Sequence, residues 1–126
     1  MKKKKNLITV AIDSPAAAGA GTQAKYISKE YNLLYLDTGK IYRLIGKIKL
    51  NNKKKFNYSF LKKKIKNINI EALNDKSLIS DEIANSASIV ARDIKIRKIV
   101  KNFQLDYAYN PPKKYSGSVL DGRDIT

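Results

Sequence analysis

Apolar and polar positions over the first 50 residues predict two strands and two helices in alternation. Residues 6–13 form a compact apolar run rich in β-branched side chains, which is typical of a strand buried on both faces of a parallel sheet. A loop of small residues, Ser14–Gly21, separates this run from positions 22–31, where apolar side chains recur at helical spacing. Those side chains are Ala24, Ile27 and Tyr31. Residues 33–37 predict a second strand and residues 38–50 a second helix, so the order is typical of a βαβ unit with parallel strands.

The chain changes character after residue 50. The polar stretch 51–55 predicts a solvated turn, and residues 56–78 scatter short apolar pieces among lysines without a clear period. A helical period resumes over residues 80–91 behind an acidic start, which suits the positive end of a helix.

The C-terminal part predicts one long helix and one short strand. Asp93 is a candidate N-cap for a helix over 94–109, which Asn110 and two following prolines bring to an end. The expected buried stripe of that helix consists of Ile96, Ile99, Val100, Phe103 and Tyr107. Residues 118–120 predict a third strand, so we expect an α/β fold.

Length and composition indicate one small domain outside the membrane. The chain has 126 residues, and no apolar stretch approaches the roughly 18 residues that a spanning helix needs. The basic start resembles a signal peptide, but the apolar run behind it is short and ends in Asp13 without a cleavage-like segment. The sequence contains neither cysteine nor histidine, which excludes disulfides and thiolate metal sites and removes the commonest general base. We therefore expect a cytoplasmic protein with no membrane partner.

A formal net charge of +15 leaves two interpretations of the partner. Clustered lysines release counterions when they meet phosphates, which would favour nucleic acid. Alternatively, the abundance of Lys, Asn and Ile reflects a preference for A- and T-rich codons. The lysines occur in runs with little arginine and no interleaved aromatic residues, so the pattern favours the second interpretation, and nucleic acid is not an expected partner.

The loop after the first strand has the composition of a phosphate cradle. Small residues let successive backbone N–H groups turn inward around an anion, and the positive end of the following helix faces it. The stretch consists of Ser14, Pro15, Ala16, Ala17, Ala18, Gly19, Ala20, Gly21 and Thr22. Gly19 fits the phosphate-loop pattern, but Ser14 replaces its first glycine and Ala20 replaces its lysine. These residues alone leave a second interpretation open, a small-residue turn that packs a helix onto a strand.

Five segments taken together are far more specific than the loop. The strings AIDSPAAAGAGTQAK, LLYLDTGKIYR, IANSASIVA with a following IR, FQLDYA and VLDGRDI occur here in this order. In this order they closely resemble the cytidylate kinase family over nearly all of the chain. The resemblance implies a P-loop NTPase-like fold, with a three-layer α/β/α core and a parallel sheet. It also implies transfer of the γ-phosphoryl group of ATP to CMP or dCMP with Mg²⁺, with residues 14–22 as the ATP site.

The resemblance assigns four residues to the acceptor nucleotide. Thr38 and Arg43 flank the start of the second helix, where a hydroxyl can bond base or phosphate and an arginine can hold a phosphate bidentately. Ser88 and Arg97 match the family's positions for holding the cytosine base. Without the resemblance, Arg43 and Arg97 would fit solvated helix arginines and Ser88 an ordinary helix serine.

The charged cluster after the third strand is the second group that the resemblance implies. Asp121, Arg123 and Asp124 follow a strand at the end where open α/β sheets bind ligands. The resemblance implies that Arg123 neutralises phosphates, that Asp121 neighbours a Mg²⁺-bound water or the acceptor phosphate, and that Asp124 contacts the pyrimidine or the sugar. Arg123 and Asp121 are thus the candidate catalytic residues, and no side chain is assigned as a metal ligand. A surface Asp-Gly turn is the alternative, and Thr126 stands where the family usually has glycine.

The missing loop lysine leaves two accounts open. That lysine follows the γ-phosphoryl group and offsets its developing charge, and loss of one such donor typically costs about 10²–10³ in rate. Either the chain keeps a nucleotide fold as a weak or inactive enzyme, or another cation moves in. Lys40 is the candidate for the second account, because the family usually has a small or apolar residue there.

We expect a single P-loop kinase domain over residues 1–126 with a small acceptor-binding insertion at roughly 51–92. The resemblance stops little more than halfway through the family's length, so we expect a truncated sequence that is incomplete at the C-terminus and lacks the lid half. ATP and CMP or dCMP are the expected partners, and the full-length protein is expected to be a monomer. The alternatives are a monophosphate kinase with another base preference and a noncatalytic nucleotide- or nucleic-acid-binding module.

Overall fold

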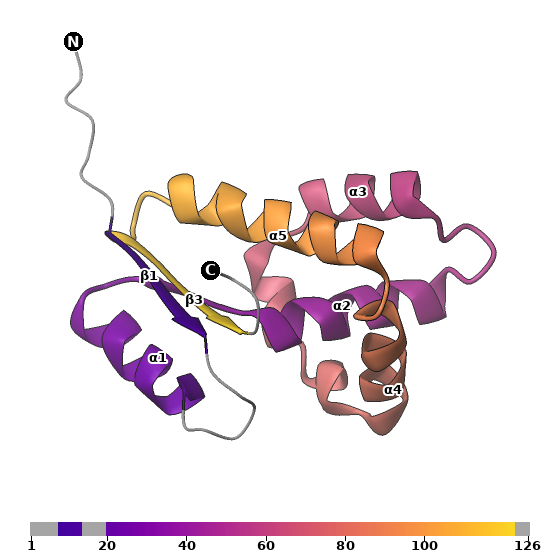
Figure 1. Cartoon of the computed structure of the whole chain (residues 1–126), viewed down its shortest axis with the longest axis horizontal. Helices are drawn as coiled ribbons and strands as arrows, with labels where there is room; N and C mark the ends of the chain where they lie inside the picture. Colours follow the sequence, from indigo (N-terminus) through magenta and orange to yellow (C-terminus); the bar gives the residue numbers. More distant parts are fainter. Residues whose placement is uncertain (1–7, 14–19, 123–126) are drawn as a thin grey trace, which may run out of the picture. The chain divides into compact units, whose positions relative to one another are not determined.

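The computed structural model describes residues 8–13 and 20–122 of the chain (Figure 1). Its elements in chain order are β1 (Ile8–Asp13), α1 (Ala20–Glu30), β2 (Leu34–Asp37), α2 (Thr38–Asn51), α3 (Tyr58–Lys66), the 3₁₀ helices η1 (Ile70–Asn74) and η2 (Lys76–Ile79), α4 (Asp81–Val90), α5 (Ile94–Tyr109) and β3 (Gly117–Gly122). They group into two compact units. The sheet unit contains the described residues up to Thr38 and from Gln104 onward, and the helical unit contains residues 39–103. Among the described residues, no helix is long and apolar enough to cross a membrane.

The sheet unit holds a parallel sheet in which β3 lies between β1 and β2. Val119 of β3 is the register partner of Val10 on one side and of Tyr35 on the other. The expected parallel sheet is therefore confirmed. The two strands that follow one another in the sequence are not neighbours, because the distant strand β3 pairs with both.

The two faces of β3 contact different helices of the sheet unit. Val119 and Leu33 are buried together, and Ile27 of α1 packs against them. Ser118 is also buried, and its Oγ donates a hydrogen bond to the backbone carbonyl of Tyr107 in α5, at 3.0 Å. Because successive strand residues point to opposite faces, α1 covers one face and the last turns of α5 cover the other. This confirms the three-layer α/β/α arrangement that the resemblance implies.

The helical unit is organised around apolar stripes that recur at three- and four-residue spacing along its helices. Its buried apolar side chains are Ile41, Leu44, Ile45, Leu61, Ile65, Leu73, Leu78, Ile83, Ala87, Val90, Ile96, Ile99, Val100 and Phe103. Four of the five side chains expected on the buried stripe of α5 belong to this set. The fifth, Tyr107, lies in the sheet unit and is half-buried.

Residues 56–78, for which the sequence pattern predicts no element, form α3, η1 and η2. Helix α3 begins because the side chain of Asn57 accepts a hydrogen bond from the backbone N–H of Phe60, at 2.8 Å. Its buried residues are Leu61 and Ile65, one turn apart among lysines. One apolar pair is too short a pattern to distinguish a helix from a loop in the sequence.

Two local expectations have opposite outcomes. Asp93 does cap α5, because its Oδ1 accepts from the backbone N–H groups of Lys95 at 2.9 Å and Ile96 at 3.4 Å. The expectation that Tyr31 lies on the apolar face of the first helix is wrong, since α1 ends at Glu30 and Tyr31 is 61% exposed. The chain turns at Asn32, whose φ of 53° lies in the left-handed region that asparagine tolerates.

Candidate functional site

The carboxyl ends of the three strands meet at one edge of the sheet. Asp121 of β3 is the register partner of Ile12 in β1 and of Asp37 in β2, and Asp13 pairs with Gly122. Parallel strands all run toward this edge, and open α/β sheets bind their ligands there.

Three segments singled out in the sequence meet at this edge of the sheet unit. The glycine-rich loop follows β1 directly in the sequence, α2 begins with Thr38 directly after β2, and Asp121 lies near the end of β3. The register therefore brings one acceptor-site candidate and one catalytic candidate to the edge at which the candidate phosphate loop begins.

Part of the expected site lies outside the described residues. This applies to Ser14, Pro15, Ala16, Ala17, Ala18, Gly19, Arg123 and Asp124. Ala20, Gly21 and Thr22 form the first turn of α1, so the helix begins within the expected phosphate loop. The first turn of a helix offers backbone N–H groups and a partial positive charge, both of which suit an anion.

Thr38 is held in the core of the sheet unit by a residue that the sequence analysis did not assign. The side-chain amide of Gln104 in α5 donates a hydrogen bond from Nε2 to Thr38 Oγ1, at 2.7 Å. The two residues are 7% and 4% exposed respectively, so the hydrogen bond is shielded from water. The hydroxyl expected to contact the acceptor nucleotide is therefore an acceptor for a buried amide.

A signal for Gln104 was present in the sequence. On α5 it stands one turn after Val100 and one turn before Ala108, and all three are buried. A polar residue on an otherwise apolar helical stripe indicates a buried hydrogen bond, because an unpaired buried amide is costly. The sequence could not identify the partner, which lies 66 positions away.

Arg43 is bonded within the helical unit. It is half-buried on α2, and its Nη1 donates to the backbone carbonyl of Leu78 in η2, at 2.9 Å. One turn further along α2, Lys47 forms an ion pair with Asp75. The hydrogen bond from Lys47, followed by that from the backbone N–H of Ser77, lowers the pKa of Asp75 to about 2. One face of α2 thus anchors the segment that contains η2.

The other expected acceptor residues lie on the surface of the helical unit. Ser88 is exposed on α4, and its Oγ donates to the backbone carbonyl of Ala84, at 3.2 Å. Arg97 is exposed on α5, and Lys40 is half-buried in the first turn of α2. Together with Arg43, the acceptor candidates of this unit are distributed over three helices.

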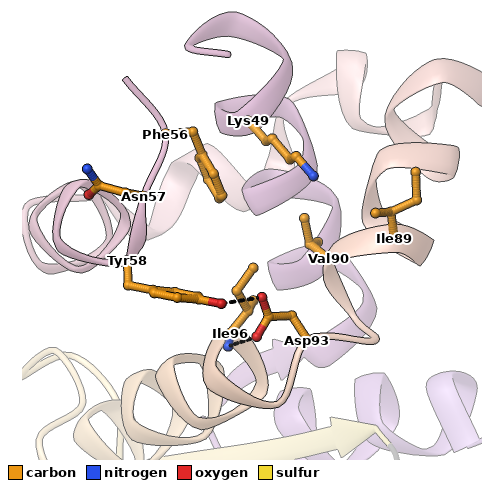
Figure 2. A pocket seen from close by; sticks show the side chains of 8 residues that line it. All are labelled: Lys49, Phe56, Asn57, Tyr58, Ile89, Val90, Asp93 and Ile96. Carbon is orange, nitrogen blue, oxygen red and sulfur yellow. Dashed lines mark hydrogen bonds between the residues drawn. The ribbon is translucent and has the colours of Figure 1, made fainter. Parts of the chain in front are cut away.

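A cavity of about 370 Å³ opens between helices of the helical unit (Figure 2). It is lined by Lys49, Phe56, Asn57, Tyr58, Ile89, Val90, Asp93 and Ile96, none of which is an expected site residue. The Tyr58 hydroxyl donates to Asp93 Oδ2 at 2.7 Å, while the other carboxylate oxygen caps α5. This hydrogen bond raises the pKa of Tyr58 and lowers the pKa of Asp93. Both carboxylate oxygens serve structural bonds, so the cavity offers no candidate catalytic group.

The family model of cytidylate kinase matches residues 10–126 of this chain. The chain belongs to the cytidylate kinase family. It is 34% identical to the cytidylate kinase of Rhodospirillum rubrum over 117 residues, which cover 92% of this chain and 55% of the relative. Identity to the cytidylate kinase of Paramagnetospirillum magneticum is 38%, with 92% and 55% covered, and to that of Rhodopseudomonas palustris (strain ATCC BAA-98 / CGA009) 36%, with 92% and 53% covered. The chain thus spans about half the length of the curated relatives it matches.

Membership of the cytidylate kinase family agrees with the architecture of the sheet unit. The matched range includes the whole glycine-rich loop, all of the helical unit and the charged cluster after β3. The resemblance stated from five short segments is therefore confirmed at the level of the family. Within the range, Ala20 remains the departure that bears most directly on chemistry.

Proposed function

We propose that this chain supplies the nucleotide-binding core of a kinase that transfers the γ-phosphoryl group of ATP to CMP or dCMP. The observation that carries the proposal is the register of β3 between β1 and β2. It brings Asp121 and Thr38 to the edge at which the glycine-rich loop begins. The family match over residues 10–126 supports the choice of substrate class.

The proposed division of labour follows the two units. The loop 14–22 and the start of α1 bind the phosphates of ATP, and the helical unit contributes acceptor-binding residues. The half-buried guanidinium of Arg43, held at Leu78, supports this because a fixed arginine binds a phosphate with little loss of side-chain freedom. We propose that Arg43, Ser88 and Arg97 contact CMP. The insertion expected at roughly 51–92 lies within this unit.

The charged groups after β3 are proposed to act on the transferred phosphoryl group. Arg123 neutralises its charge, Asp124 contacts the pyrimidine or sugar of the acceptor, and Asp121 lies beside the phosphates. Transfer between phosphates needs little acid or base chemistry, because the acceptor oxygen is already anionic and catalysis consists of positioning with charge neutralisation. A site without histidine suits this reaction.

The residues at the carboxyl edge fit a magnesium ion that arrives with ATP. Asp37 and Asp121 are register partners on neighbouring strands. Mg²⁺ commonly uses one or two protein carboxylates, while nucleotide phosphates and water supply its remaining oxygens. When bound, the ion would neutralise phosphate charge, and Asp121 is the carboxylate proposed to lie nearest to it.

A second candidate function is favoured by Ala20 and by the net charge of +15. Without the loop lysine, the fold would retain nucleotide binding but lose most of its rate, and a basic surface would also attract nucleic acid. This candidate is a noncatalytic nucleotide- or nucleic-acid-binding module.

Binding and turnover measurements on the same chain separate the two functions. The kinase proposal predicts saturable binding of CMP in preference to AMP at fixed salt, and formation of CDP from CMP and Mg²⁺-ATP. The module predicts affinity for arbitrary duplex DNA that falls steeply as salt rises, because binding releases counterions. Equal affinity for CMP and AMP together with salt-sensitive DNA binding would overturn the kinase proposal.

A further inference from the structure

Gln104 occupies a core position where an apolar side chain would avoid the cost of desolvating an amide. It is 4% exposed, and its Nε2 donates to Thr38 Oγ1 at 2.7 Å. Buried polar side chains are retained where their hydrogen bonds define one arrangement of their neighbours. The neighbour here is the first residue of α2, at the carboxyl edge of the sheet.

The hydrogen bond acts on the direction and the strength of the Thr38 hydroxyl. A threonine hydroxyl has one proton to donate and two acceptor lone pairs. Donation from Gln104 occupies one lone pair and fixes the side-chain rotamer of Thr38. It also polarises the O–H group, and in a low-dielectric interior a hydroxyl that accepts a hydrogen bond is a stronger donor.

We propose that Gln104 is a positioning residue for the acceptor nucleotide. It holds the Thr38 hydroxyl in the rotamer from which that hydroxyl donates to CMP or dCMP, and it does not itself touch the nucleotide. This inference rests on the proposed function, and it adds a residue and a role that the resemblance does not assign.

Two substitutions at position 104 separate positioning from packing. Gln104→Met keeps a long side chain but removes the donor. We expect it to weaken CMP affinity about three- to tenfold, the worth of one hydrogen bond, and to leave ATP affinity unchanged. Asn102→Met removes an exposed amide from the same helix and should change neither affinity. In a Thr38→Val background, Gln104→Met should weaken CMP binding no further.

Gln104→Glu adds a readout that a packing role would not move. An ionised carboxylate cannot donate to Thr38, whereas a protonated carboxyl can, and burial raises the pKa of a carboxyl. The affinity of Gln104→Glu for CMP should therefore be weak at pH 8 and recover toward pH 5. The unsubstituted chain and Gln104→Met should show no such recovery.

Several results would overturn the proposal. Unchanged CMP affinity in Gln104→Met would do so, as would equal losses for CMP and ATP. If the variants fail to fold, three-bond NMR couplings in the unsubstituted chain still decide, because averaging of Thr38 over several rotamers contradicts a fixed hydroxyl. Failure of the proposed function looks different, since the unsubstituted chain would then bind neither CMP nor ATP, and that result overturns both.

Discussion

Gly46 of α2 lies directly against the backbone of α4 at Ala87. A Cβ atom at position 46 would lie 2.8 Å from the Ala87 nitrogen and 3.2 Å from the carbonyl oxygen of Ile83. Ser86 reinforces the contact, because its Oγ donates to the Gly46 carbonyl at 3.0 Å. The missing side chain therefore sets how closely the two helices approach.

Gly46→Ala should destabilise the helical unit, because the obstructing atoms belong to the backbone and no side-chain rotation can relieve them. Overpacking of this kind costs about 1–3 kcal/mol, which chemical unfolding would measure. Gly39→Ala, at an exposed position of the same helix, is the control and should be neutral or stabilising because alanine favours helices. Equal stability of the two variants would contradict the proposed contact. Since α2 carries Arg43 and α4 carries Ser88, CMP affinity should fall only in Gly46→Ala.

The ion pair between Lys47 and Asp75 predicts an acid-dependent change in stability. A carboxyl with a lowered pKa stabilises the fold above its ordinary value of 3.8, and this contribution is lost as pH falls toward about 2. Lys47→Met should raise the pKa of Asp75 toward 3.8 and flatten that part of the stability profile. The Ser77 N–H should still hold the pKa somewhat below its ordinary value.

An NMR titration of the Asp75 carboxyl carbon measures this pKa directly. Lys62→Met removes an exposed lysine from α3 and serves as the control. If the pKa of Asp75 is the same in Lys47→Met and in the unsubstituted chain, Lys47 is not its main cause.

Ala20→Lys restores the lysine that phosphate loops carry. If the chain is a kinase weakened at this position, CDP formation should rise about 10²–10³-fold, because the lysine offsets charge that develops in transfer. The dissociation constant for CMP should change little. Gln23→Lys adds the same charge to α1 at another position, and an equal gain from it would indicate general electrostatics and not a restored loop.

Lys40 tests the competing account, in which a second cation replaces the loop lysine. Lys40→Ala should then reduce turnover about 10²-fold or more, and Ala20→Lys in the same chain should restore it. Lys49→Ala, also half-buried on α2, is the matched control. An unchanged rate in Lys40→Ala ends the hypothesis of compensation.

The sequence by itself determined the features whose signals are local. Helix α5 has the predicted bounds 94–109, because Asp93 supplies a cap and an apolar stripe runs along its length. The parallel strands and the glycine-rich loop were also readable, since each lies within a short stretch. Membership of the family followed from short strings in a defined order and not from any single residue.

Only the tertiary structure decided which distant residues meet. Nothing local to β1 or β2 indicates that β3 pairs with both, and no pattern on α5 identifies Thr38 as the partner of Gln104. The close approach at Gly46 likewise depends on a second helix that the sequence does not align with it. The physical reason is that register, buried hydrogen bonds and interhelical spacing are set by complementarity between surfaces far apart in the chain, whereas caps and apolar periods act within a few residues.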